Sequence, residues 1–346
     1  MNDFDKYTIP DTASIKDALI ALNNLSSDVL TLFILNSNNS VVGTLTDGDV
    51  RRVLIGGGTL NDSIASAMNR NFHYVHEDNI DIAEIKKLKN KNLTLLPSLN
   101  KDMQIIRVYN LKKLNSILPL DAILMAGGKG VRLRPLTENT PKPLLKVGDK
   151  AIIDYNIDRL LNFGIKNISV TVNYLKEQIE EHFQSLREGV KINCVREPNF
   201  LGTIGSVKLI DTFQNDYILV MNSDLFTNIN YEDFYLHCLE HEADMSVVSV
   251  PYSINVPYGI FELDGRYIKG ISEKPTYNYY ANAGIYLIKK SLLNLIPDDV
   301  CYNATDLIEL LIKKEYKVIR FPLMGYWIDI GKHEDYKKVQ ELIKHI

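Results

Sequence analysis

The chain has 346 residues, of which 45% are apolar and 24% are charged, and its formal net charge is −4. This length favours two domains, and the composition is that of a globular protein without a basic surface for nucleic acid or membranes. The three scattered cysteines exclude a disulfide framework or a tetrahedral zinc site. The acidic N-terminus lacks a signal-peptide pattern and no apolar run is long enough to cross a membrane, so we expect a cytoplasmic protein.

Residues 1–117 carry a degenerate internal repeat. Apolar residues at helical spacing over 15–22 precede the strand pattern LTLFIL, and the same order recurs at 82–88 before LTLLPSL. We therefore expect two copies of a helix-strand-strand unit, which together form a small α+β domain over residues 1–117.

The first copy ends in a T-x-x-D pattern, in which Thr46 and Asp49 stand between a strand at 41–46 and a helix expected to begin near Val50. The pattern and the repeat resemble a pair of CBS domains. In that family these two residues contact the ribose of a bound nucleotide, which implies a regulatory nucleotide at Thr46 and Asp49. The two side chains could instead only cap the helix, with Asp47-Gly48 as a turn, and the pair could serve only to dimerise the chain. The second copy lacks the pattern.

From residue 118 onward, nearly continuous apolar runs alternate with helical segments. Buried strands are expected at 122–126, 168–172, 217–221 and 245–250, with helices such as 152–163 and 231–242 between them. This alternation is typical of a layered α/β domain over residues 118–346. Ligands of such domains gather at the carboxyl ends of the strands.

The segment 124–137, LMAGGKGVRLRPLT, has three glycines within four residues directly after the first of these strands. Gly127, Gly128 and Gly130 allow the backbone to lie against a phosphate chain and free its amides to donate hydrogen bonds. Two common phosphate motifs are excluded by spacing. A P-loop needs Gly-Lys-Ser/Thr after four variable residues, and a dinucleotide fingerprint beginning at Gly128 needs glycine where Leu133 stands.

Together with Pro141-Lys142-Pro143, this segment resembles the G-G-x-G-x-R-L-x-P-L-T…K-P pattern of the nucleotidyl-sugar transferases. The resemblance extends through residues 118–346 and implies a Rossmann-like mixed, mainly parallel sheet flanked by helices. It also implies transfer of a nucleoside monophosphate from a nucleoside triphosphate to a sugar-1-phosphate. In that family Ala126 and the loop glycines cradle the triphosphate, Arg132 holds its β- and γ-phosphates, and Lys142 holds the α-phosphate.

Two further segments resemble motifs of the same family. The segment 197–207 is similar to its L-G-T-x-G motif, which implies that Glu197, Gly202 and Thr203 lie against the nucleotide base. Asp224 follows a buried strand as in the family's G-D motif, and Asp329 stands in a segment similar to W-x-D-x-G. The resemblance implies that these two carboxylates bind one Mg²⁺, although Asp224 alone could be a turn or cap residue.

A third group resembles the residues that line the family's sugar-phosphate pocket. The group consists of Gly259, Glu273, Lys274 and Asn282, together with Asp224. Lys274 would place the sugar phosphate and act as a catalytic residue beside Arg132, Lys142 and Asp224. Taken alone, Glu273-Lys274-Pro275 is more typical of a solvated turn.

The order of a CBS pair before this transferase resembles the glucosamine-1-phosphate guanylyltransferases of bacterial legionaminic acid biosynthesis. That resemblance implies GTP and glucosamine-1-phosphate as substrates and GDP-glucosamine as the product, and we also expect a homo-oligomer. Uridylyl, thymidylyl and cytidylyl transfer stay open, as do mannose and acetylated sugars. A function of another class is a non-catalytic sensor of a nucleotide or nucleotide sugar. The intact set of charged motif residues argues against it: Arg132, Lys142, Asp224, Lys274 and Asp329.

Overall fold

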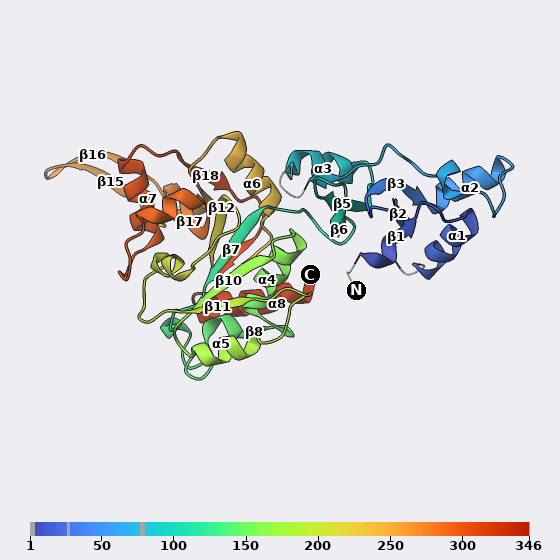
Figure 1. Cartoon of the computed structure of the whole chain (residues 1–346). Coiled ribbons are helices and arrows are strands. Elements are labelled where there is room, and N and C mark those ends of the chain that lie inside the picture. The colour runs from blue at the N-terminus through green and yellow to red at the C-terminus, as the bar shows by residue number, and fades with distance from the viewer. Residues whose placement is uncertain (1–3, 26–27, 77–79, 346) are drawn as a thin grey trace. The chain divides into compact units, whose positions relative to one another are not determined.

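The computed structural model describes residues 4–25, 28–76 and 80–345, and the chain forms two compact units, Met1–Ile117 and Leu118–Ile346 (Figure 1). The first three residues of the acidic N-terminus lie outside the described residues. No helix within the described ranges is long and apolar enough to span a membrane.

The first unit contains two three-stranded sheets that are built in the same way. In each, a helix connects two parallel strands and an antiparallel third strand follows. The first copy consists of β1 (Thr8–Pro10), α1 (Ile15–Asn24), β2 (Thr31–Leu35) and β3 (Val41–Thr46), and the second of β4 (Val75–His76), α3 (Ile82–Asn90), β5 (Leu95–Leu99) and β6 (Ile105–Asn110). The first copy continues into α2 (Asp47–Ile55), whereas turns and irregular backbone follow the second at 111–119. The expected repeat is therefore present, with a short leading strand added to each copy.

Side-chain caps begin the helices of the first copy. Ser14 and Asp17 form a reciprocal capping box at α1, and Thr46 and Asp49 form another at α2. Because Thr46 is the cap, α2 begins at Asp47 and not near Val50. The expectation of a separate Asp47-Gly48 turn was wrong, since both residues belong to the first turn of the helix.

The second unit is an α/β domain around a seven-stranded sheet with the order β11-β10-β7-β12-β17-β14-β18. Its strands are β7 (Leu120–Met125), β10 (Asn167–Val172), β11 (Asn193–Arg196), β12 (Tyr217–Asn222), β14 (Met245–Asn255), β17 (Thr276–Lys289) and β18 (Val318–Pro322). Neighbours run parallel except on both sides of β17, which is antiparallel to β12 and to β14. The expectation of a mixed, mainly parallel sheet is confirmed.

Helices flank this sheet, and short strand pairs belong to the same unit (Figure 1). The helices are α4 (Ile152–Asn162), α5 (Lys176–His182), α6 (Tyr231–Glu240), α7 (Ala304–Lys313) and α8 (His333–Leu342). The strand pairs are β8 (Lys146–Val147) with β9 (Lys150–Ala151), β13 (Leu225–Thr227) with β19 (Trp327–Asp329), and β15 (Ile260–Asp264) with β16 (Tyr267–Ser272).

Helices α6 and α7 cover opposite faces of the sheet. On β12, Ile218 and Val220 lie in the same hydrophobic core as Leu307 of α7. The next residue along the strand, Met221, instead accepts a hydrogen bond at its sulfur from the Tyr231 hydroxyl of α6, at 3.3 Å. Side chains alternate between the two faces of a strand, so the two helices bury the sheet from both sides. This burial holds the strand ends that carry the site.

Candidate nucleotide-binding site

A cavity of about 330 Å³ opens where the carboxyl ends of β7 and β12 meet. The two strands pair in register up to Met125 opposite Asn222, and the Ser223 hydroxyl donates to the Met125 carbonyl at 2.7 Å. The cavity is lined by residues 125–128, 130–133, 142–143, 197, 200, 202–203, 222–224 and 331. It therefore lies at the edge where parallel sheets place their ligand sites.

All residues predicted to bind the nucleotide line this cavity. They are Ala126, Gly127, Gly128, Gly130, Arg132, Lys142, Glu197, Gly202 and Thr203. They belong to separate segments that follow β7 and β11, and the sheet brings those segments together. Phe200, Asn222 and Gly331 also line the cavity but were not predicted. Their positions within or beside the L-G-T-x-G, G-D and W-x-D-x-G segments are the signal that could have found them.

The glycine loop is closed on one side and open on the other. Gly130 adopts a left-handed conformation with φ at 60°, and its carbonyl accepts hydrogen bonds from the Thr137 hydroxyl at 2.8 Å and the Leu133 amide at 2.9 Å. A Cβ at Gly127 would lie 2.8 Å from Glu197 Oε1, whereas no atom lies within 4 Å of a Cβ placed at Gly128. The loop backbone is thus fixed and faces open space, as a phosphate cradle requires.

Glu197 is a buried carboxyl in the wall of this cavity, with only 3% of its surface exposed. Burial raises the pKa of Glu197, and hydrogen bonds from the Thr171 hydroxyl, the Leu201 amide and the Ser206 hydroxyl act in the opposite direction. These donors fix the orientation of the carboxyl beside Gly127. Glu197 can therefore accept hydrogen bonds from a ligand without first being ordered.

The two predicted metal ligands are far apart in the sequence and are brought together by the β13–β19 ladder. Leu225 pairs with Asp329, and the Ile330 amide donates to the Asp224 carbonyl at 3.2 Å. The Lys142 ammonium donates to Asp224 Oδ2 and lies 3.7 Å from Asp329 Oδ1. Lys142 thus lies between both carboxylates, at the edge of the cavity.

The pair of carboxylates fits a divalent cation. Asp224 Oδ1 is buried and has no hydrogen-bond partner, which leaves one oxygen of the pair available as a ligand. Burial and, after it, the negative charge of Asp224 raise the pKa of Asp329, which a bound cation would reverse. No group of three or more His, Cys, Asp or Glu side chains suited to a metal occurs in the described part of the chain. Asp224 and Asp329 would hold such a cation, which would supply positive charge beside a phosphate chain in the cavity.

Asn156 on α4 holds the turn that carries Asp224. Its side chain is 2% exposed, and Nδ2 donates to the Leu225 carbonyl at 2.9 Å and to the Ser223 carbonyl at 3.3 Å. The two acceptors flank Asp224, so Asn156 fixes the backbone on both sides of that residue. The sequence offered no signal for this role, because a single asparagine on an amphipathic helix belongs to no motif.

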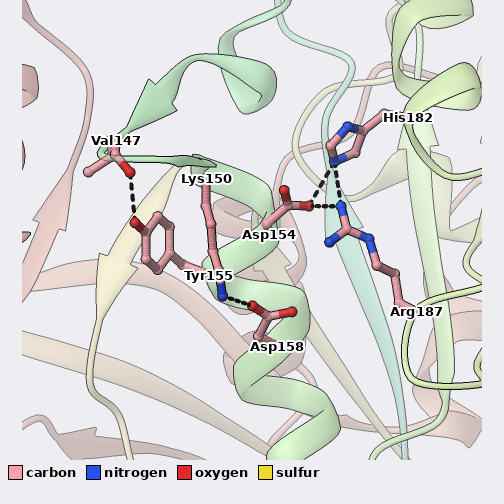
Figure 2. A network of polar contacts seen from close by, with 7 residues as sticks. All are labelled: Val147, Lys150, Asp154, Tyr155, Asp158, His182 and Arg187. Carbon is pink, nitrogen blue, oxygen red and sulfur yellow. Dashed lines mark hydrogen bonds and ion pairs between the residues drawn. The ribbon is translucent and has the colours of Figure 1, made fainter.

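Helix α4 is also tied to α5 through the Asp154 carboxylate (Figure 2). Asp154 Oδ1 lies 2.7 Å from His182 Nε2 and 2.7 Å from a guanidinium nitrogen of Arg187. Burial alone would raise the pKa of Asp154, but the hydrogen bond to His182 and the nearby charges of His182 and Arg187 outweigh it and lower the pKa. On α5, the Gln178 side chain donates to the Asn139 carbonyl at 3.0 Å, so the network supports the segment that follows the glycine loop.

The predicted sugar residues lie outside the cavity lining, apart from Asp224. Gly259, Glu273 and Lys274 belong to an arm, residues 251–280, formed by the outer parts of β14 and β17 and by the β15–β16 hairpin. Gly259 and Glu273 are adjacent, since a Cβ at Gly259 would lie 2.9 Å from Glu273 Oε2, and Lys274 is exposed. Asn282 is nearer the cavity, because it accepts a hydrogen bond from the Gly284 amide and Gly284 packs against Asn222.

In the first unit, the polar atoms of Thr46 and Asp49 are engaged in the cap of α2. The Asp49 carboxylate accepts from the Thr46 amide at 2.8 Å and from the Thr46 hydroxyl at 2.5 Å, and it also pairs with Arg52. This geometry agrees with the cap alternative. A ribose contact at these two residues stays a prediction.

A fixed glycine loop at the end of a buried strand, facing a buried lysine and two carboxylates, defines a nucleotide-binding α/β domain. The family model of the nucleotidyl transferases matches residues 121–345, and the chain belongs to that family. The family model of the CBS domain matches residues 2–56, so a CBS domain stands at the N-terminus. That match covers the first copy of the repeat.

Similar proteins include a mannose-1-phosphate guanyltransferase of Pichia angusta, 30% identical over 227 residues that make up 63% of this chain and 62% of that protein. The bifunctional protein GlmU of Methanocaldococcus jannaschii is 34% identical over 224 residues, which are 62% of this chain and 52% of that protein. The matches thus span less than two thirds of either relative. Among solved structures, HddC from Yersinia pseudotuberculosis has a TM-score of 0.52 and 25% identity over 64% of this chain and 99% of that one.

Proposed function

We propose that the chain transfers a nucleoside monophosphate from a nucleoside triphosphate to a hexose-1-phosphate, which yields a nucleotide sugar and pyrophosphate. The observation that carries this proposal is the convergence of the glycine loop, Lys142 and Asp224 at one cavity, with Asp329 beside Lys142. Membership of the nucleotidyl transferase family supports the same activity.

In the proposed reaction, an oxygen of the sugar phosphate attacks the α-phosphorus of the triphosphate in line. The new oxygen–phosphorus bond forms while the bond from the α-phosphorus to the bridging oxygen breaks, and pyrophosphate leaves with that electron pair. The attacking oxygen is already ionised at neutral pH, so no general base is required. Catalysis consists of bringing two anions together and neutralising the charge of the leaving group.

The residues of the cavity match those tasks. The open backbone of the glycine loop donates amide hydrogens to the triphosphate, and Arg132 in the cavity wall pairs with its β- and γ-phosphates. Mg²⁺ on Asp224 and Asp329 would neutralise phosphate charge. Lys142 contacts the α-phosphate from its position beside both carboxylates. The sugar-phosphate role proposed for Lys274 requires the arm to lie closer to the cavity than it does in this structure.

We propose GTP as the nucleotide, on the chemistry of Glu197. Guanine presents two adjacent N–H donors on one edge, and a carboxylate can accept both at once. Uracil, thymine and cytosine each offer fewer donors to such a group. The buried, oriented carboxyl of Glu197 in the cavity wall therefore favours guanine. The name of the Pichia relative, a mannose-1-phosphate guanyltransferase, points to the same base.

We propose glucosamine-1-phosphate as the acceptor and GDP-glucosamine as the product, for legionaminic acid or surface-glycan biosynthesis. The support is the order of domains, with a CBS domain before the transferase, which resembles the guanylyltransferases of that biosynthesis. Mannose-1-phosphate is the alternative, because it is named in the Pichia relative.

Pyrophosphate release from the full chain, measured with GTP, UTP, dTTP and CTP against glucosamine-1-phosphate, mannose-1-phosphate and N-acetylglucosamine-1-phosphate, tests the activity and its substrates. GTP with glucosamine-1-phosphate should have the highest kcat/KM. Arg132→Ala and Asp224→Ala should each lower turnover by about 100-fold or more with an unchanged circular dichroism spectrum. Arg134→Ala is the matched control, since Arg134 is exposed and does not line the cavity. Full activity in either cavity variant would refute the assignment of nucleotidyl transfer to this cavity. No pyrophosphate release with any pair of triphosphate and sugar phosphate would favour a nucleotide sensor.

Glu197→Gln tests the choice of base separately. The amide would offer a donor where guanine also offers donors, so kcat/KM for GTP should fall by about 10- to 100-fold, with a much smaller effect on UTP. The exposed Glu188→Gln in the same unit is the control and should leave both values unchanged. An equal loss with all four triphosphates would mean that Glu197 supports the loop and does not select the base.

A further inference from the structure

The arm, residues 251–280, ends in the β15–β16 hairpin, which extends away from the rest of the second unit (Figure 1). In the β15–β16 hairpin, Phe261 lies opposite Ile271 and Leu263 lies opposite Ile268. Residues two apart on a strand share a face, and so do residues directly opposite, which places all four side chains on one face. Each of them is 53–65% exposed. Apolar pairs in a sheet are normally buried on one side, so this hairpin lacks the layer that would cover it.

The base of the arm repeats the pattern. Tyr252 lies opposite Tyr279 and Ile254 lies opposite Tyr277, and these four side chains are 41–57% exposed. In total, the exposed apolar surface of the arm is on the order of 1,000 Å², at roughly 200 Å² for a fully exposed aromatic side chain. The largest apolar patch of a typical monomer is about 300–600 Å². Each of the two faces falls within that range, and together they reach the roughly 800 Å² per partner of a stable protein interface.

The backbone of the arm is also unpaired along its outer edges. Strand β18 pairs with β14 only as far as Ser249, and β12 pairs with β17 only from Ile285 onward. Beyond those residues the arm consists of two-stranded ribbons, which are marginally stable in water without a further layer or strand. Free strand edges are sites where another strand adds. Both the faces and the edges of the arm therefore require a partner.

The charges of the hairpin indicate which partner fits. Glu262 and Asp264 are balanced by Arg266 and Lys269, and Asp264 pairs with Lys269 at 2.6 Å. A surface with equal numbers of both charges around apolar pairs has no net charge to repel a second copy of itself, which suits an interface about a two-fold axis. A polyanion or a strongly charged protein would require an excess of one sign. We propose that the arm is the interface through which two copies of this chain form a two-fold symmetric dimer.

Sedimentation equilibrium of the full chain tests this proposal. The wild type should be a dimer, and Phe261→Glu, which places a carboxylate in the centre of the apolar face, should raise the dimer dissociation constant by at least 100-fold. Met324→Glu is the matched control, because Met324 is 94% exposed and lies outside the arm, and this variant should remain dimeric. Phe261 is exposed, so circular dichroism of the variant should match that of the wild type.

Hydrogen exchange gives a second measurement that does not depend on a substitution. Amides of residues 251–280 in the wild type should become more protected as the protein concentration rises through the dissociation constant. A wild type that stays monomeric at high concentration would overturn the proposal. A dimer that persists in Phe261→Glu would also overturn it, because the interface would then lie elsewhere. Protection of the arm in the monomer would do the same, because another part of the chain would then cover the arm.

Discussion

Replacing Asn156 by leucine removes the buried amide that holds the Asp224 turn, without opening a large cavity, because the two side chains have similar volumes. The Leu225 carbonyl loses a 2.9 Å hydrogen bond and the Ser223 carbonyl loses one of 3.3 Å. Both acceptors are left facing an apolar group inside the fold. The turn that carries Asp224 then has lost its support from α4.

The magnitude follows from those two bonds. A buried acceptor without a partner costs about 1–3 kcal/mol, and the longer of the two bonds contributes the smaller part, so Asn156→Leu should lower the free energy of unfolding by about 2–4 kcal/mol. For a domain of this size each kcal/mol shifts Tm by about 2–4 °C, which gives a decrease of roughly 5–15 °C. Trp327 is the only tryptophan of the chain and belongs to β19, so its fluorescence follows the unfolding of the second unit alone.

Turnover measured over a range of Mg²⁺ concentrations distinguishes a support for Asp224 from a purely structural role. In Asn156→Leu the half-saturating Mg²⁺ concentration should rise by about 3- to 10-fold, because Asp224 is no longer held in one orientation, a loss worth about 1 kcal/mol. Asn162→Leu, at the exposed end of the same helix, should change neither Tm nor the half-saturating Mg²⁺ concentration. A lower Tm with an unchanged Mg²⁺ dependence would refute the positioning role, and an unchanged Tm would refute the energetic reasoning.

Two further predictions concern acid stability and the metal. Because the pKa of Asp154 is held below its ordinary value of 3.8, its ionised form stabilises the fold at neutral pH, and this contribution is lost as the pH falls through the lowered pKa. Asp154→Asn should therefore lower the free energy of unfolding, measured with urea, by about 1–3 kcal/mol at pH 7 and by progressively less below pH 4. A loss of stability that does not change with pH would contradict this reasoning. Chelation by EDTA should abolish turnover reversibly but leave Tm nearly unchanged, because the positive charges of Lys142 and Arg132 offset the negative charges of the two carboxylates when no metal is bound. A large fall in Tm would show that the metal is structural.

The local features of this protein could be predicted from its sequence. The strand before the glycine loop, the helix after Ala151 and the repeat of the first unit follow from apolar spacing, which depends only on neighbouring residues. The start of α2 was misplaced because Thr46 and Asp49 cap each other and extend the helix to Asp47. The glycine loop was identified because its residues belong to one continuous segment, which resembles the pattern of the nucleotidyl-sugar transferases.

Contacts between distant segments were not predictable in the same way. The sequence by itself determined the main elements, their order and the residue types suited to phosphate and metal, since each of these depends on a short stretch of chain. Only the tertiary structure decided that Asn156 holds the Asp224 turn, that Lys142 lies between two carboxylates and that the arm is uncovered. The physical reason is that these contacts depend on strand order and register, which bring together residues that no local pattern relates.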